Sequence, residues 1–474
     1  MYKSTFMGLN TALRGVLAHQ NALDVTGHNI SNVNTNGYTR QRAELSTTAP
    51  WSSPSLMSQT TPGQMGTGVE VLRIERLRDR YIDQNVRQQF GRQSMSQTMV
   101  DQLDQVESAF NEPGDLGISK LMSKFFDSIT AVGNNPADPG TRATFAQNVD
   151  ALANGLRQTA ADLTTIAAQS NTRLNDTVTT VNGISQQIAS LNTEISLALQ
   201  HNQQPNDLLD QRDRLMDDLS KVVNYTWTEA ATGEVTITMG TTTPIALVDP
   251  LVAGGFTAIV RADLDTAYGN GDLTSGSAFA DEELNNTTIP AYMTALDNIA
   301  GELVLSVNAA HSTGSFDLNG NAGGNVFDPL MTTAASIRLD PANNILTNPR
   351  LVAAASSWGG GGEPSNGSIF LNAMAALRTA PNASMGGATF QGYYTGTITG
   401  LGAQASGFQN SLSNADVLVD MAVARRDQVS GVSMDEEMSN MLRFQNSYNA
   451  SARVLTTMDD AIDTIINRMG RVGL

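Results

Sequence analysis

The chain of 474 residues contains no cysteine, so disulfides, thiolate metal sites and cysteine nucleophiles are excluded. Histidine is scarce, and none of the four histidines stands in an H-E-x-x-H pattern or beside a cluster of carboxylates. No lysine follows a glycine, which excludes a P-loop, and no G-x-S-x-G nucleophile motif occurs. We therefore expect a structural protein: not an enzyme, with no catalytic residue, no cofactor, no metal and no small-molecule substrate.

Basic residues are few, with 28 lysines and arginines against 46 acidic residues and a net charge of −18. Residues 225–345 carry −12 of that charge, which argues against nucleic acid or an anionic membrane as a partner. Long apolar runs are also lacking, so no transmembrane helix is expected. The N-terminus has no apolar segment of the signal-peptide kind, which alone would indicate the cytoplasm, although export without cleavage leaves the same pattern.

The two ends of the chain carry matched apolar stripes at the 3-4 spacing of a heptad. The N-terminal stripe, within residues 4–34, consists of Phe6, Leu9, Leu13, Val16 and Leu23. The C-terminal stripe begins near Met434 and consists of Met441, Tyr448, Leu455, Ile462 and Met469, seven apart, with Ile466 at the companion position. Each stripe is too narrow to be buried alone, so each needs a partner helix, and we assign these residues to an assembly interface.

A turn follows the N-terminal helix, because Asn and Gly tolerate the left-handed backbone that turns need. Its residues Asn29, Asn32, Asn34, Gly37 and Tyr38 are assigned to the same interface.

Between the ends, residues 39–78 look extended, with a strand near 69–74, and helices are predicted over 79–110 and 119–132. The longest helical pattern runs over 141–200 and places Leu174, Val181, Ile188 and Ile195 seven apart, with Gly155 and Gly183 as candidate interruptions. A helix restarts at Asn206, in which Asp210 and Arg214 have the spacing of an ion pair. Strands are expected over 226–283, a helix over 289–310, loops over 311–328 and 359–367, and a last helical region broken at Gly431.

These segments predict a mainly α fold in which terminal amphipathic helices pair as a coiled coil, a long-helix bundle forms a rod and a small β-rich domain is inserted. Residues 1–72 plus 432–474 form the terminal assembly helices and extended loop, an inner-tube domain. Residues 73–225 plus 284–431 form the helical rod domain, and residues 226–283 form the β-rich outer insertion.

Two polar segments have a functional and a plain interpretation. Oxygen side chains follow EF-hand-like spacing over 317–328, but Ala322 replaces the glycine and Asp328 the bidentate glutamate of such a loop. A tight Asn-Gly turn explains the same residues and is favoured over calcium binding. The Asp-Arg cluster at 207–214 is interpreted as a solvated or domain-bridging helix face with internal ion pairs, not as an acidic site.

The segment Leu23–Tyr38 resembles the signature shared by flagellar rod proteins, the hook protein and the first hook-associated protein, although Asn36 stands where proline usually precedes Gly-Tyr. Four further segments are similar to the hook-associated protein 1 (FlgK) family in particular. They are Phe125–Arg142, Asn206–Leu219, His311–Phe327 and Gly431–Ile466.

The resemblance implies an extracellular structural subunit of the bacterial flagellum at the hook–filament junction, secreted by the flagellar type III route. It also implies helical or ring self-assembly through the terminal helices, with the hook subunit below, the next hook-associated protein above and an export chaperone at the C-terminal helix. One alternative is another axial protein, such as the hook subunit or a distal rod protein. A wall hydrolase using Asp435 and Glu437 is a second, but residues two apart on a helix point to different faces.

Overall fold

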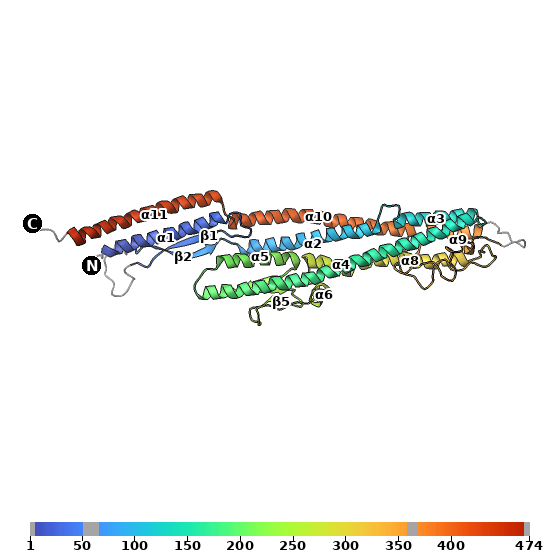
Figure 1. Ribbon diagram of the computed structural model, residues 1–474, viewed down its shortest axis with the longest axis horizontal. Coiled ribbons are helices and arrows are strands. Elements are labelled where there is room, and N and C mark those ends of the chain that lie inside the picture. The colour runs from blue at the N-terminus through green and yellow to red at the C-terminus, as the bar shows by residue number, and fades with distance from the viewer. Residues whose placement is uncertain (1–4, 51–65, 358–366, 469–474) are drawn as a thin grey trace, which may run out of the picture. The chain divides into compact units, whose positions relative to one another are not determined.

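Helices dominate the computed structural model, which describes residues 5–50, 66–357 and 367–468 (Figure 1). The α-helices are α1 (Thr5–Ser31), α2 (Arg80–Phe110), α3 (Ile118–Asn134), α4 (Pro139–Gln200), α5 (Asn206–Val222), α6 (Arg261–Gly269), α7 (Ser277–Glu283), α8 (Ile289–Ser312), α9 (Ser368–Thr379), α10 (Phe390–Ser430) and α11 (Met434–Asp463). Short π-helical turns, η1 (Leu284–Thr288) and η4 (Thr464–Arg468), and 3-10 turns, η2 (Pro349–Leu351) and η3 (Ala383–Met385), complete them. The predicted mainly α fold is confirmed.

The strands form two small antiparallel sheets. One pairs β1 (Gln41–Thr47) with β2 (Val69–Arg76), and the other has the order β3 (Thr226–Glu229), β4 (Val235–Met239), β5 (Ile245–Val248). None of the helices in the described ranges has the length and apolar character needed to cross a membrane.

The chain divides into two compact units that do not follow the predicted domain limits. Unit 1 comprises Met1–Gly91, Thr180–Ile259 and Asp416–Leu474, and unit 2 comprises Arg92–Thr179 and Val260–Ala415. The helices α2, α4 and α10 contribute residues to both units. The division of the chain into inner, rod and outer domains stays a prediction.

The helix α4 runs without interruption over 62 residues. The four positions that the sequence spaced seven apart, Leu174, Val181, Ile188 and Ile195, have no exposed surface. Gly155 does not interrupt the helix; a Cβ there would lie 2.5 Å from Leu121 Cδ1, so glycine allows α3 to pack closely. Each buried aliphatic side chain of this row contributes about 1.5–3 kcal/mol of hydrophobic stabilisation.

The predicted β-rich region is shorter than expected. Alternation of buried and half-buried residues in β4 confirms a strand there, but the strands end at Val248. Residues 261–283 instead contain α6 and α7, so the strand prediction for them is wrong. The buried residues Leu264 and Ala267 have helical spacing, and the Asp263 carboxylate accepts the Val260 N–H at 2.8 Å and caps α6.

The core of unit 2 is rich in aromatic side chains from α2, α3, α4, α9 and α10. The rings of Phe125 and Phe126 pack edge to face, with their centroids 5.0 Å apart, and Phe145 packs edge to face against Phe370. Such pairs contribute about 0.5–1.5 kcal/mol beyond their area burial. The loops after α8 close this core at residues 311–355.

His311, at the end of α8, is fully buried among those loops. Its Nδ1 lies 2.6 Å from the Gly324 carbonyl oxygen and its Nε2 accepts the Ala353 N–H at 2.8 Å. Both bonds are satisfied by a neutral ring that carries its proton on Nδ1. Burial lowers the pKa of His311 to about 4, so the folded protein keeps this ring neutral at neutral pH.

The buried ring makes the stability of unit 2 depend on pH. The unfolded chain binds the His311 proton near pH 6.5 and the folded chain only near pH 4, so stability is complete above pH 6.5 and falls as the pH decreases. We expect a loss approaching about 1.4 kcal/mol per pH unit below pH 6, measured by urea unfolding between pH 7 and 5. His311→Gln is expected to flatten this dependence, whereas substitution of the exposed His201 should leave it unchanged. Equal slopes for all three proteins would contradict the assignment.

Candidate functional site

The two terminal helices, α1 and α11, pair side by side in antiparallel orientation (Figure 1). Gly8 faces Met458 and Gly15 faces Ser451. At the far end of the pair the Asn29 amide bonds Glu437. Residue numbers rise along α1 as they fall along α11, so the two helices are antiparallel. The contacting residues are spaced by seven or a multiple of seven on both helices, which is coiled-coil spacing.

The face of α1 that packs against α11 is made of small residues. Gly8, Gly15 and Ala22 are spaced seven apart, and Ala18 and Ala22 are almost fully buried. A Cβ on Gly8 would lie 3.1 Å from Met458 Sδ, and one on Gly15 would lie 3.0 Å from Ser451 Oγ. The small residues therefore let the two helix backbones approach closely.

The predicted stripe of α1 is partly buried in the single chain. Phe6 and Leu13 are 54% and 43% exposed, while Leu9, Val16 and Leu23 are half-buried. The sequence left open whether this stripe packs within the chain or against a neighbouring copy. In the single chain, small residues contact α11 because they permit closer backbone approach. The role of the stripe as an assembly interface is not affected and stays a prediction.

The predicted stripe of α11 is more evenly buried than the stripe of α1. Met441, Tyr448, Leu455 and Ile462 are all half-buried along the helix, whereas Ile466 is 65% exposed. Met469 lies outside the described residues. Other apolar side chains of α11, namely Met434, Met438, Leu442, Val454 and Met458, are exposed.

We call the exposed apolar side chains of the helix pair the terminal apolar surface. On α1 it consists of Phe6, Leu13 and Leu17, which recur at intervals of seven and four and so share one helix face. On α11 and η4 it consists of Met434, Met438, Leu442, Val454, Met458, Ile465 and Ile466. Exposed apolar side chains gathered on two paired helices are typical of interaction sites.

Asn29 ties the end of α1 to β1 and α11. Its Nδ2 donates to the Gln41 carbonyl at 2.8 Å and to Glu437 Oε2 at 3.0 Å, and its Oδ1 accepts the Gln41 N–H and the Tyr38 hydroxyl. Arg40 completes the contact by donating to Glu437 Oε1 at 2.8 Å. Asn29 and Glu437 are almost fully buried, so loss of either would leave buried polar atoms unpaired.

The rest of the predicted turn fixes the chain after α1. Asn32 Nδ2 donates to the His28 carbonyl at 3.0 Å and closes the helix end, while Asn34 is exposed. Gly37 has φ +74°, a conformation that favours glycine, and the Arg214 side chain packs where a Cβ would stand. Burial, together with nearby carboxylates, raises the pKa of Tyr38, so its hydroxyl stays protonated and donates to Asn29.

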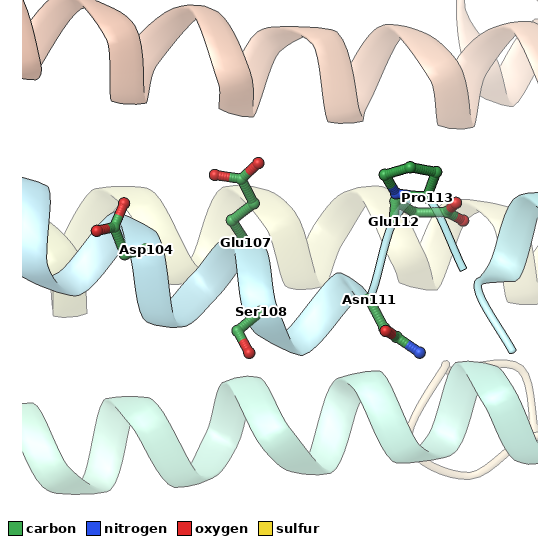
Figure 2. Close-up of a pocket in the computed structure, with 6 residues that line it drawn as sticks. All are labelled: Asp104, Glu107, Ser108, Asn111, Glu112 and Pro113. Carbon is green, nitrogen blue, oxygen red and sulfur yellow. The ribbon is translucent and has the colours of Figure 1, made fainter. Parts of the chain in front are cut away.

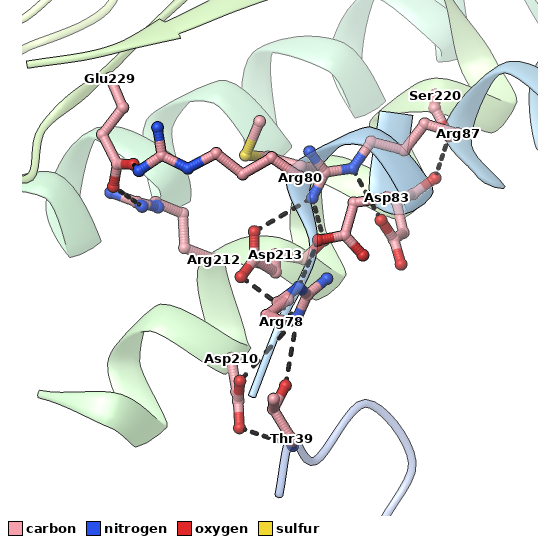
Figure 3. Close-up of polar contacts among 12 residues, drawn as sticks. Thr39, Arg78, Arg80, Asp83, Arg87, Asp210, Arg212, Asp213, Ser220 and Glu229 are labelled. Atoms are coloured by element: carbon pink, nitrogen blue, oxygen red, sulfur yellow. Dashed lines mark hydrogen bonds and ion pairs between the residues drawn. The ribbon is translucent and has the colours of Figure 1, made fainter. Parts of the chain in front are cut away.

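An ion cluster lies beside this turn and joins α2, α5, α10 and the end of β2. Figure 3 shows the part of it around Asp213, with Arg78, Asp83, Arg87 and Asp210. We call it the Arg–Asp cluster, and it consists of Arg76, Arg78, Arg87, Arg426, Asp83, Asp210, Asp213 and Asp217. The Asp213 carboxylate lies within 2.9–3.2 Å of three of these arginines. The cluster balances four positive charges with four negative ones, as buried ions require.

The position of Asp213 determines how it titrates. Burial by itself raises the pKa of its carboxyl, but the surrounding guanidinium groups outweigh burial and hold that pKa below its usual range. The aspartates of this helix do form ion pairs, but with arginines of other segments and not within the helix as predicted, and the predicted pair of Asp210 and Arg214 is wrong. Asp210 instead pairs with Arg76 and accepts the Thr39 N–H, while Arg214 donates to the Asn36 carbonyl.

Sequence reasoning missed the arginines of this cluster. Residues 73–87 contain five of the chain's arginines, and residues 207–218 contain five aspartates. The complementary charge of these two segments was a signal that the two could pair. Turn chemistry singled out Asn29 and Tyr38, whose assembly role stays a prediction, whereas Arg40 and Glu437, which hold Asn29 in place, were missed.

The pocket near the end of α2 is acidic and lies within unit 2 (Figure 2). Asp104, Glu107, Ser108, Asn111, Glu112 and Pro113 line it. Glu112 Oε1 already accepts the Ser119 N–H at 2.9 Å and the Tyr394 hydroxyl at 3.2 Å, so this carboxylate serves to cap α3. The lining has no nucleophile paired with a base.

Two other candidates for chemistry have plain structural roles. Asp317 Oδ1 accepts the Asn319 and Asn321 N–H groups at 2.8 Å, and Gly320 has φ +83°, which is the tight turn weighed against calcium. Across the part of the chain that the structure describes, no group of three histidine and carboxylate side chains is placed to hold a metal ion. Both Glu437 oxygens are bonded by Asn29 and Arg40, while its proposed partner Asp435 is exposed.

Comparisons with known proteins agree along the chain. The family model described as the flagellar hook-associated protein FlgK helical domain matches residues 103–327. The model of the flagellar basal body rod FlgEFG protein C-terminal matches residues 426–469, and that of the flagella basal body rod protein matches residues 9–39. The last two matches fall on the paired terminal helices.

Curated relatives extend over nearly the full chain. Flagellar hook-associated protein 1 of Bacillus subtilis is 31% identical over 98% of this chain and 99% of the relative, and that of Escherichia coli K12 is 26% identical over 97% and 99%. The solved structure of the flagellar hook junction protein FlgK from Burkholderia pseudomallei matches with a TM-score of 0.59 at 15% identity. That match covers 73% of this chain and 100% of the solved one, and it supports the fold.

Proposed function

This chain belongs to the flagellar hook-associated protein 1 family, and from that premise we propose that its paired terminal helices are the surfaces through which copies of it assemble. It is a structural protein of the extracellular bacterial flagellum, at the junction between hook and filament. The alternatives, the hook subunit or a distal rod protein, are set aside because the hook-associated helical domain matches residues 103–327.

The observation that carries the proposal is the terminal apolar surface. The small-residue face of α1 packs against α11, and several larger apolar side chains of both helices remain exposed in the single chain. Burial of each against a neighbouring copy would contribute about 1.5–3 kcal/mol before the cost of ordering. Several such side chains per copy would be enough to drive assembly once subunits reach the tip of the growing flagellum.

The partners follow from this arrangement and from the family. We propose that the subunit rests on the hook subunit below and carries the next hook-associated protein above. Before assembly, an export chaperone would cover the exposed apolar side chains of α11, and the chain would leave the cell by the flagellar type III route. Residues 1–72 plus 432–474 would form the inner tube, residues 73–225 plus 284–431 the rod layer, and residues 226–283 the outer surface.

No catalytic step is part of the proposal. The Glu437 carboxylate, which a wall hydrolase would need free, fastens α11 to Asn29 and Arg40. Its substitution is therefore a question of stability and assembly, not of activity.

Imaging of flagella from a strain that lacks this gene tests the proposed function. We expect hooks without filaments, and filament subunits released into the medium, because the junction is needed to hold the first filament subunits. Supply of the intact gene in trans should restore filaments. Normal filaments in the deletion strain would contradict the proposal.

A further inference from the structure

A buried polar layer interrupts the apolar core of unit 2 at the π-helical turn η1. Its centre is Asp281, which is 3% exposed. Asp281 Oδ1 accepts three hydrogen bonds, from Gln102 Nε2 at 2.6 Å, from Ser170 Oγ at 2.9 Å and from Arg173 Nε at 2.9 Å. The layer therefore joins α2, α4 and the segment from α7 to η1.

Four atoms of this layer have no hydrogen-bond partner within the part of the chain that the structure describes, although each is buried. They are Gln102 Oε1, Arg173 Nη2, Asn285 Oδ1 and Thr288 Oγ1. Gln102 and Thr288 are 2% and 3% exposed. Gln102 and Arg173 bond the Asp281 carboxylate directly, Asn285 bonds it through Ser170, and Thr288 stands three residues after Asn285 in the same π-helical turn. Buried polar atoms are almost always paired in folded proteins, so these unpaired atoms indicate a ligand.

The orientation of the two amides is fixed by their other bonds. Gln102 must direct its NH2 group at the Asp281 carboxylate, which leaves its oxygen free. Asn285 Nδ2 donates to Ser170 Oγ at 3.1 Å, so its oxygen is free as well. The layer thus presents two acceptors, one guanidinium donor and one hydroxyl that serves as either.

We propose that this layer binds one or two internal water molecules, which bridge α2, α4 and η1. A water molecule donates two hydrogen bonds and accepts up to two, which satisfies both amide oxygens, Arg173 Nη2 and the Thr288 hydroxyl. The ligand is neutral because the charges of Asp281 and Arg173 already cancel. A cation would lie beside the guanidinium, and an anion would lie beside the carboxylate and two amide oxygens.

The π-helical turn gives the site a structural purpose. A π-helical turn carries hydrogen bonds of wider spacing and is found where a helix accommodates a functional feature. Here it places Asn285 and Thr288 within one turn of the helix, following Asp281. Bonds through water tolerate small shifts better than direct bonds, so the layer would fix the register of the helices and still permit slight bending of the bundle.

Thr288→Val tests the proposal through the sign of its effect on the melting temperature. If the Thr288 hydroxyl binds water, its loss should lower the melting temperature of the full chain by about 2–4 °C. If the hydroxyl is merely unpaired in a dry core, the isosteric valine should leave the temperature unchanged or raise it, which would overturn the proposal. Thr26→Val is the matched control, since Thr26 is also 3% exposed and its hydroxyl donates to the Ala22 carbonyl within its own helix.

A crystal structure of the full chain supplies the direct observation. We expect ordered water within hydrogen-bond distance of Gln102 Oε1 and Asn285 Oδ1, and fewer such waters in Thr288→Val. Repositioned side chains that pair with one another and leave no water between them would overturn the proposal. A melting temperature that depends on which monovalent cation is present, sodium or potassium at equal ionic strength, would overturn it too, because the ligand would then be an ion.

Discussion

Replacement of both Leu13 and Leu17 with aspartate is expected to leave the free subunit folded and to abolish its assembly at the junction. The two side chains are 43% and 51% exposed in the single chain and point away from the small-residue face that packs on α11. In the assembly, the change would remove about 3–6 kcal/mol of apolar burial per subunit and would place unpaired charges in a buried contact. Because each 1.4 kcal/mol is a factor of ten, affinity between subunits should fall at least a hundredfold.

The measurement is complementation of a deletion strain, with filaments counted by electron microscopy. The double variant should appear in the culture medium and be missing from hooks, while circular dichroism and the melting temperature of the purified subunit stay close to wild type. Leu251→Asp is the matched control, because Leu251 is 94% exposed but lies in the predicted outer insertion. Filaments formed by the double variant would contradict the assembly role. Replacement of both residues by glutamine provides a milder second variant should aspartate weaken α1.

Replacement of Asp213 with asparagine is expected to destabilise unit 1 by about 3–5 kcal/mol. The substitution preserves shape but removes the negative charge that Arg76, Arg78 and Arg87 share. These guanidinium groups are 14%, 13% and 5% exposed, so water cannot take over the lost interaction. Urea unfolding followed by circular dichroism measures the change.

The control for this prediction is Asp218→Asn on the same helix. Asp218 is 56% exposed and pairs with Lys221, three residues along α5, so its loss should change the unfolding free energy by less than about 0.5 kcal/mol. Acid provides a second check. Since the pKa of Asp213 is lowered in the folded protein, its contribution is present above pH 4 and is lost as the pH falls further. The difference in unfolding free energy between wild type and Asp213→Asn should therefore become smaller in acid. A difference that stays constant with pH would contradict the charge-based account.

The sequence predicted most helices because their burial pattern repeats along one element. The row Leu174 to Ile195 on α4 needs only the 3.6-residue period to be recognised, and the structure buries all four residues. The break at Gly431 likewise separates α10 from α11 as expected. Such features depend on local spacing, which a single sequence contains in full.

Features that depend on which elements meet were harder to predict. Nothing local distinguishes the face of α1 that carries Gly15 from the face that carries Leu13, because the choice depends on how closely α11 approaches. Arg76 and Asp210 lie 134 residues apart in the chain, and nothing near either residue indicates that the fold brings them together as an ion pair. The short helices α6 and α7 lie in a segment of turn-forming residues, and tertiary packing of Leu264 decides their structure.

The glycines that let α1 lie close to α11 also make α1 a poor helix on its own, since each costs about 1 kcal/mol relative to alanine. Its partner is encoded at the opposite end of the gene, more than 400 residues later. The N-terminal segment is thus expected to gain its helix only after the last part of the chain has arrived. A prematurely terminated subunit would present a flexible end in place of a helix pair, and the growing structure would have a means of rejecting incomplete copies.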